Sequence, residues 1–260
     1  MGKIRRRRGA QTGSLVRPPL PVNQRPVSKV DDCLALLSRS LLPYRCLICG
    51  ERGISRDLCP ACSRALPWNH CACDRCGLPL PLAADACGRC LKTPPPFART
   101  HAALVYSFPL DRLLLRFKFH GDLACGRLLS DLLCERLTDS ERPQALVPVP
   151  LHVARLRERG YDQALELAKF VAGRTGIALH ARALRRTRAT SRQSDLDMRA
   201  RRRNLHGAFA LAENDLPAHV ALIDDVMTTG ATLRECAKTL LRSGVARVDV
   251  WVVARAPRFA

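Results

Sequence analysis

The sequence is poor in aromatic residues and has no long apolar run. Phe, Trp and Tyr together make up 5% of the 260 residues, so few side chains are available to stack on nucleic-acid bases. No segment approaches the roughly 20 apolar residues that a membrane-spanning helix needs, and the basic start of the chain lacks the apolar run of a signal peptide. We therefore expect no membrane span and a cytoplasmic location.

Acidic residues are scarce relative to basic ones. The chain has 43 Lys and Arg against 23 Asp and Glu, which gives a formal net charge of +20. A surplus of this size favours polyanionic partners through electrostatic steering and the release of counterions. A general enrichment in Ala and Arg is an alternative source of the surplus, so charge alone does not name the partner. Residues 1–30 are predicted to form a disordered basic tail.

The length and the hydrophobic content allow one sizeable core and one smaller module. Hydrophobic residues make up 47% of the chain, which is enough to build an α/β core. Three consecutive prolines at 94–96 are typical of a stiff spacer between domains. We therefore predict a small module over residues 41–93 and a larger domain over residues 97–257.

Eight of the thirteen cysteines form four Cys-x-x-Cys pairs. Such a pair places two thiolates on one tight turn, and two facing turns complete a tetrahedral Cys₄ shell for Zn²⁺. In chain order, the pairs predict two structural zinc sites in a double zinc ribbon. The alternatives are reduced cysteines without metal and a redox role, although redox pairs normally occur singly. The predicted ligands are Cys46, Cys49, Cys59 and Cys62 in the first site and Cys73, Cys76, Cys87 and Cys90 in the second, with His70 and Cys71 as further candidates that the spacing does not need.

Beyond the prolines, strand-like and helix-like apolar patterns alternate along the chain. The predicted strands cover residues 102–106, 145–147, 220–223 and 247–254, and the predicted helices cover residues 110–119, 126–137, 161–172 and 232–242. This alternation predicts an α/β fold, an open parallel sheet with helices on both faces. Ligands of such sheets bind at the carboxyl ends of the strands.

Two carboxylates and a Thr-rich turn follow the predicted strand at residues 220–223. Paired carboxylates suit two vicinal hydroxyls or a hydrated Mg²⁺ ion. The turn leads into a predicted helix, where backbone N–H groups and the helix dipole form an anion hole for a phosphate monoester. Its glycine allows a close backbone approach. The residues predicted to bind phosphate and ribose are Asp224, Asp225, Thr228, Thr229, Gly230, Ala231 and Thr232.

This order of strand, acidic pair, Thr-Thr-Gly-x-Thr and helix resembles the 5-phosphoribosyl-1-pyrophosphate (PRPP) signature of type I phosphoribosyltransferases. With two zinc ribbons ahead of it, the chain resembles the ComF family from about residue 41 to residue 255. That family is associated with natural competence, on the cytoplasmic side of DNA uptake, and joins a double zinc ribbon to a type I phosphoribosyltransferase-like domain. Asp162 stands where Asn is expected in the family pattern. The matching segments are residues 147–152, Arg155, residues 159–164, residues 184–186, Gln193, Arg199, Asn204 and residues 207–209.

The resemblance also implies where a diphosphate would bind. Residues 150–152 with two nearby arginines would cradle it, and residues 182–203 would supply a mobile basic loop. That loop has nine arginines against two aspartates, a net charge of +7. Arg forks suit phosphate oxygens, and a solvated basic face is the alternative. The candidate catalytic residues are Arg155, Arg159, Arg185 and Arg188.

Three functions remain open from the sequence. The first is a ComF-like competence protein that binds single-stranded DNA and a PRPP-like ligand, with Trp68, Tyr106 and Phe119 as candidate stacking residues. The second is an active phosphoribosyltransferase that uses PRPP and Mg²⁺ to modify an unidentified nitrogen acceptor. The third is docking of a protein partner by the ribbons, such as a DNA-uptake helicase or a channel component.

Overall fold

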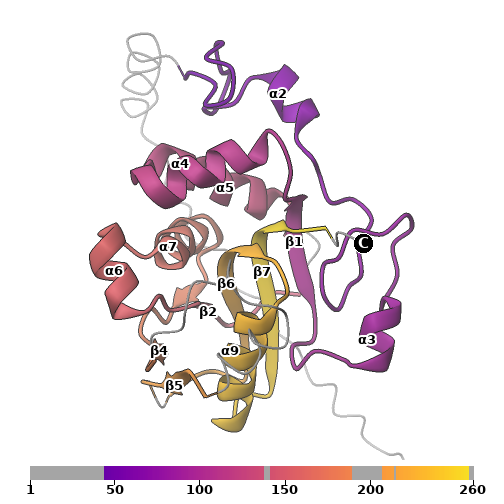
Figure 1. Ribbon diagram of the computed structural model, residues 1–260, viewed down its shortest axis with the longest axis vertical. Helices are drawn as coiled ribbons and strands as arrows, with labels where there is room; N and C mark the ends of the chain where they lie inside the picture. The colour runs from indigo at the N-terminus through magenta and orange to yellow at the C-terminus, as the bar shows by residue number, and fades with distance from the viewer. Residues whose placement is uncertain (1–43, 138–140, 189–206, 214, 258–260) are drawn as a thin grey trace, which may run out of the picture. The chain divides into compact units, whose positions relative to one another are not determined.

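The computed structural model of the chain describes residues 44–137, 141–188, 207–213 and 215–257 (Figure 1). The predicted basic tail at residues 1–30 lies outside the described residues. Residues 189–206 also lie outside the described residues, and they include the larger part of the arginine-rich segment at residues 182–203. Within the described ranges, no helix has the length and apolar character needed to cross a bilayer.

Five parallel strands form the central sheet, in the order β1-β7-β6-β2-β3. The two long inner strands are almost wholly buried, as expected of a parallel sheet that is covered on both faces. The predicted open parallel sheet is therefore confirmed. The strands are β1 (Thr100–Val105), β2 (Ala145–Pro148), β3 (Ala178–Leu179), β6 (His219–Met227) and β7 (Arg247–Arg255).

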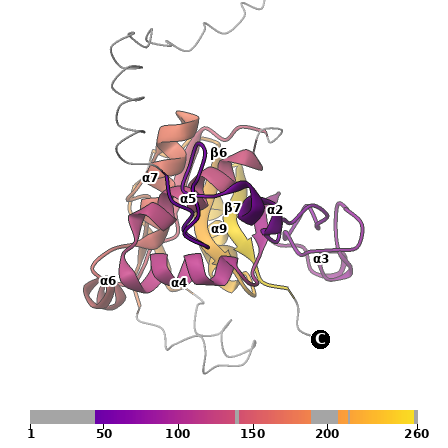
Figure 2. The same ribbon diagram turned by 90° about the horizontal axis from the view of Figure 1, so that it is seen from above.

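Helices cover both faces of this sheet, and successive strand residues point to opposite faces. Leu222 and Val250 pack with α9 (Ala231–Arg242), whereas Ile223 and Trp251 belong to the cluster on the other face. That second face is covered by α4 (Leu110–His120), α5 (Leu123–Glu135) and α7 (Gln163–Thr175), which lie together in Figure 2.

Aspartate caps shift the starts of two predicted helices. Asp122 accepts hydrogen bonds from the amides of Ala124 and Cys125, so α5 begins earlier than predicted. Asp162 accepts one from the amide of Leu165 at 3.1 Å, so α7 begins at Gln163. A side-chain oxygen at this position satisfies an amide that has no partner within the helix.

Several short elements were not predicted, and three of them lie outside the ribbons and the central sheet. Helix α6 (Val153–Arg159) has no buried residue and therefore no apolar periodicity to detect. Strands β4 (Leu184–Arg186) and β5 (Phe209–Leu211) form a separate antiparallel pair of three residues each. Strands this short give almost no alternation in the sequence.

The two cysteine-rich segments pack on opposite faces of the sheet. The first ribbon (residues 44–66) contains α2 (Pro60–Ala65), and Cys46 and Cys59 belong to the cluster with α4 and α5. The second ribbon (residues 71–93) contains α3 (Gly88–Lys92), and its cluster cysteines belong to the core on the α9 side. Each ribbon thus shares a hydrophobic cluster with the α/β core.

Candidate functional site

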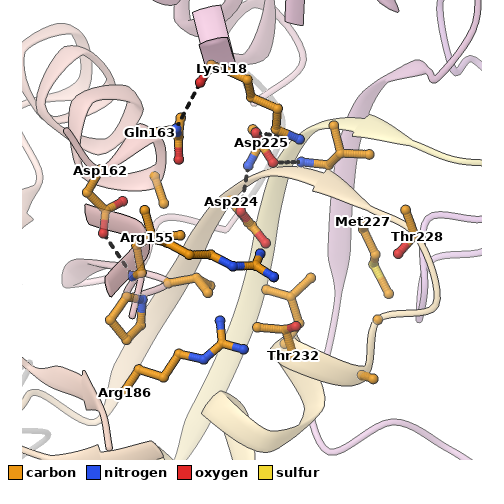
Figure 3. A pocket seen from close by; sticks show the side chains of 18 of the residues that line it. Lys118, Arg155, Asp162, Gln163, Arg186, Asp224, Asp225, Met227, Thr228 and Thr232 are labelled. Atoms are coloured by element: carbon orange, nitrogen blue, oxygen red, sulfur yellow. Dashed lines mark hydrogen bonds and ion pairs between the residues drawn. The ribbon is translucent and has the colours of Figure 1, made fainter. Parts of the chain in front are cut away.

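An open pocket of about 350 Å³ lies at the carboxyl end of β6 (Figure 3). Strand β6, the turn into α9, α6, β4 and the end of α4 all contribute to its lining. All seven residues that the sequence predicted to bind phosphate and ribose line this pocket. The ends of parallel strands meet at this edge, which is why residues from distant segments converge there.

Asp225 is buried and ion-paired in this pocket. Its side chain is 9% exposed, and its Oδ2 lies 2.8 Å from Nζ of Lys118, at the end of α4. Burial alone would lower the pKa of Lys118, but attraction to Asp225 and Asp224 outweighs burial and raises it. The pocket therefore holds a fixed ammonium group against one of the two carboxylates.

Asp224 differs from an exposed carboxyl group in its pKa. Burial and the neighbouring Asp225 charge raise the pKa of Asp224 to about 8, and attraction to Lys118 offsets only part of this. Asp224 therefore holds its proton more tightly than an exposed carboxyl group does, and a bound cation would favour release of that proton.

The turn between β6 and α9 has the geometry of an anion site. Gly230 caps α9 with φ 73°, and a Cβ there would lie 2.5 Å from Cε of Met227. A residue with a side chain is therefore strained at this position. Thr229 Oγ1 accepts a hydrogen bond of 3.4 Å from the amide of Ala231. The first turn of α9 directs the positive end of the helix dipole into the pocket.

Three arginines line the pocket opposite the acidic pair. Arg155 and Arg159 come from α6, and Arg186 comes from β4. Figure 3 shows the Arg155 guanidinium directed toward Asp224 and that of Arg186 toward the Thr232 side. Burial, followed by the charge of Arg155, lowers the pKa of Arg186. Such a cluster of cations suits the oxygens of a diphosphate.

The structure separates the four arginines that the sequence proposed. Arg155 and Arg159 line the pocket, whereas Arg185 and Arg188 are exposed and are not among its described lining residues. Arg186 lines the pocket in place of Arg185. Successive strand residues point to opposite sides, so Arg186 lies on the same side as the buried Leu184, and Arg185 lies on the exposed side.

Asp162 holds the loop that precedes α6. Its Oδ2 accepts a 2.9 Å hydrogen bond from the amide of Leu151, and its Oδ1 accepts the capping bond from Leu165. Each carboxylate oxygen accepts from a different amide, whereas Asn would place an NH₂ donor at one of these two positions. The departure from the expected Asn therefore leaves the loop anchored.

The eight predicted metal ligands form two separate clusters. Cys46, Cys49, Cys59 and Cys62 form one, and Cys73, Cys76, Cys87 and Cys90 form the other, with the ligand atoms of each within 4.8 Å of one another.

Sulfur spacings in both clusters match a zinc site. A tetrahedron with Zn–S bonds of about 2.3 Å has edges of about 3.8 Å. The Sγ atoms of Cys49 and Cys59 are 3.7 Å apart, and those of Cys76 and Cys87 are 3.8 Å apart. Both clusters therefore fit structural Zn²⁺, and neither contains His70 or Cys71.

Known proteins are similar to this chain both in the zinc-ribbon segment and over most of its length. The family model described as the double zinc ribbon domain matches residues 37–91. DNA utilization protein YhgH of Salmonella typhimurium is 38% identical over 204 residues, which cover 76% of this chain and 90% of that protein. Competence protein F of Haemophilus influenzae is 37% identical over 224 residues, which cover 82% and 97%. The chain belongs to the ComF family. A more distant relative, competence protein ComFC of Streptococcus pneumoniae, is 28% identical over 59% of this chain and 67% of its own.

Several pocket residues of this ComF family member escaped the sequence reasoning. Lys118 and Gln163 line the pocket, and Gln163 is buried with Nε2 donating to the carbonyl of Lys118 at 3.4 Å. Tyr106, which the sequence suggested only as a stacking residue, also lines it. No pattern in the sequence places Lys118 beside Asp225, because the contact depends on how α4 packs. Arg186 could have been found from the alternation of strand residues, because it lies two positions after the buried Leu184 and therefore points to the same side.

Proposed function

We propose that this ComF family protein binds a phosphoribosyl ligand such as PRPP at the carboxyl end of β6 and takes part in handling single-stranded DNA during natural competence. The observation that carries the first half is the meeting of three groups in one pocket. These are the Asp224 and Asp225 pair, the amino end of α9, and a set of arginines. Phosphate, ribose hydroxyls and diphosphate are the chemical groups that match them.

The proposed ligand occupies the pocket in three parts. The 5-phosphate binds at residues 229–232, against the amino end of α9. The ribose hydroxyls face Asp224 and Asp225, the carboxylates that would also hold Mg²⁺. The diphosphate faces Arg155 and Arg159. Lys118, which is ion-paired with Asp225, keeps the acidic pair from repelling the ligand.

The second candidate function is phosphoribosyl transfer at the same pocket. A nitrogen nucleophile would form a bond to C1 of the ribose while the bond from C1 to the diphosphate oxygen breaks and pyrophosphate leaves. Mg²⁺ and the arginines would stabilise the departing charge, so the reaction needs positioning and electrostatics without a covalent protein intermediate.

Single-stranded DNA is proposed as the partner because relatives are named competence and DNA utilization proteins and because α4 has a suitable exposed face. Phe108, Leu115 and Phe119 are 65%, 46% and 62% exposed. The guanidinium of Arg112 lies 5.0 Å from the ring centre of Phe108, and that of Arg159 lies 5.2 Å from that of Phe119. Bases stack on such rings, and the arginines face the phosphates.

This α4 face (Phe108, Arg112, Leu115 and Phe119) is continuous with the pocket. Arg159 both lines the pocket and covers the ring of Phe119. A strand on the α4 face would therefore have its backbone close to the proposed diphosphate site. Of the three aromatic residues considered from the sequence, Phe119 lies on this face, Tyr106 lines the pocket, and Trp68 is half-buried with its indole N–H donating to Ser63 at 3.1 Å.

Calorimetric titration with PRPP and Mg²⁺ tests the ligand half of the proposal. We expect one saturable site in the parent protein and none in Asp225→Ala. Absence of heat and of competition with pyrophosphate in the parent would refute it. Phosphorus NMR of the same samples with nitrogen nucleophiles added separates the two candidates, because only transfer to an acceptor releases pyrophosphate beyond the level seen without one.

A further inference from the structure

Arg255 connects the second cysteine cluster to the turn that precedes α9. It ends β7, is 4% exposed, and donates from Nε to the carbonyl of Cys76 at 3.0 Å. Its Nη1 donates to the carbonyl of Met227 at 2.9 Å and also to that of Thr228. One buried guanidinium therefore joins a cluster cysteine to the phosphate loop, which we define as residues 227–230.

The same two parts also pack directly against each other. Cys76, Cys87 and Cys90 line one small cavity together with Met227 and Thr229. The cysteines of the second cluster and Met227 of the loop also belong to one hydrophobic cluster. A shift of the second ribbon would therefore reach the phosphate loop through both packing and hydrogen bonds.

The position of the Cys76 carbonyl depends on the turn that the metal would hold. Cys73 and Cys76 flank a tight turn in which the amide of Gly77 donates to the carbonyl of Cys73 at 2.7 Å, and Gly77 has φ 63°. Bound Zn²⁺ would fix both thiolates of this turn, and short metal modules lose their order without the metal. A displaced Cys76 would leave the buried guanidinium short of an acceptor, which is costly.

We propose that Arg255 couples metal occupancy of the second cysteine cluster to the order of the phosphate loop. Arg255 acts here as a positioning residue. Its effect on the loop stands independently of the ligand, whereas its effect on ligand affinity rests on the proposed function. By linkage, a ligand held on the loop also tightens metal binding at the second cluster, and we expect slower metal release to accompany the tighter binding.

The first cluster is an internal control. It packs on the α4 and α5 side, where Arg116 donates to the carbonyl of Leu47 at 2.7 Å. Among the described residues, no hydrogen bond joins its four cysteines to the phosphate loop. Loss of metal from the first cluster therefore leaves the loop unchanged.

Amide hydrogen exchange of the full-length protein tests this coupling. Cys90→Ser removes a ligand of the second cluster and Cys49→Ser a ligand of the first, and metal analysis confirms which site is empty. We expect exchange at residues 227–232 to become several-fold faster in Cys90→Ser and to match the parent in Cys49→Ser. Equal exchange in the parent and in Cys90→Ser would overturn the proposal.

Arg255→Met identifies the residue responsible. In that background the loop already exchanges fast, and adding Cys90→Ser produces a much smaller further change than it does in the parent. An undiminished effect of Cys90→Ser in Arg255→Met would show that packing alone transmits it and would refute the role of Arg255. If Arg255→Met does not fold, Arg255→Lys keeps the charge but loses the forked donors, and the same comparison applies.

Release of zinc to a coloured chelator gives a second readout. We expect two phases, of which PRPP with Mg²⁺ slows only the one missing from Cys90→Ser. Slowing of both phases equally contradicts the coupling. If calorimetry detects no PRPP binding, the proposed function fails, and the exchange comparison still decides on the coupling.

Discussion

Nζ of Lys118 lies 2.8 Å from Oδ2 of Asp225 and ties the end of α4 to the carboxyl end of β6. Lys118→Met leaves the carboxylate of Asp225 buried without this partner. Because the lysine side chain is 25% exposed, we expect a loss of roughly 1–3 kcal/mol of unfolding free energy, less than for a fully buried pair. Urea unfolding measures it.

Lys169→Met is the matched control. Lys169 is ion-paired with Glu166 at 2.7 Å, but its side chain is 53% exposed. An exposed pair of this kind contributes about 0.5 kcal/mol or less. Equal losses in the two variants would show that the Lys118 pair is no more than a surface contact.

Asp224→Asn tests the raised pKa of that carboxyl group. Its pKa rises from 3.8 to about 8, so the folded protein keeps a proton that the unfolded chain releases. Stability of the parent therefore falls as pH rises through this window, and the Asn variant does not share that loss. We expect the variant to gain more in Tm near pH 7.5 than near pH 5. A gain independent of pH would contradict the assignment.

Gly230→Ala tests the anion site. With φ 73° and Cε of Met227 in the way, a Cβ here costs roughly 1–2 kcal/mol and displaces the loop. We expect a lower Tm together with weaker PRPP binding in calorimetry. Gly160→Ala is the control, since Gly160 has φ 79° with no atom within 4 Å of the added Cβ. An equal loss of PRPP affinity in both variants would show that PRPP binding does not depend specifically on the loop at Gly230.

Phe119→Ala tests the α4 face. One lost stacking contact weakens binding of a single-stranded oligonucleotide roughly tenfold. Fluorescence anisotropy at several salt concentrations measures it, and the salt dependence should persist because the arginines remain. Leu82→Ala, at a site 79% exposed on the second ribbon, should bind as the parent does. Unchanged DNA binding in Phe119→Ala would show that the α4 face does not bind DNA. The face would then be assigned to a protein partner such as a helicase or a channel component.

Local sequence patterns predicted the parts of this protein that depend on spacing. Four Cys-x-x-Cys pairs were enough to predict both clusters, because each pair forms a turn of its own. The Asp224 and Asp225 pair with the Thr-rich turn could be located because strand, turn and helix are contiguous.

Contacts between distant segments could not be predicted in this way. Lys118 reaches Asp225 only because α4 packs against the sheet edge, and the sequence separates them by more than a hundred residues. Arg255 directly follows the strand predicted at residues 247–254, and its hydrogen bonds to Cys76 and Met227 depend on how the second ribbon docks. Helix α6 was missed because it buries no side chain.

A crystal structure of the protein with PRPP and Mn²⁺ tests the central claim most directly, since anomalous scattering locates the cation. We expect the 5-phosphate at residues 229–232, the cation beside Asp224 and Asp225, and the diphosphate facing Arg155 and Arg159. PRPP bound elsewhere, with the pocket at the end of β6 empty at a PRPP concentration that saturates binding, would contradict it.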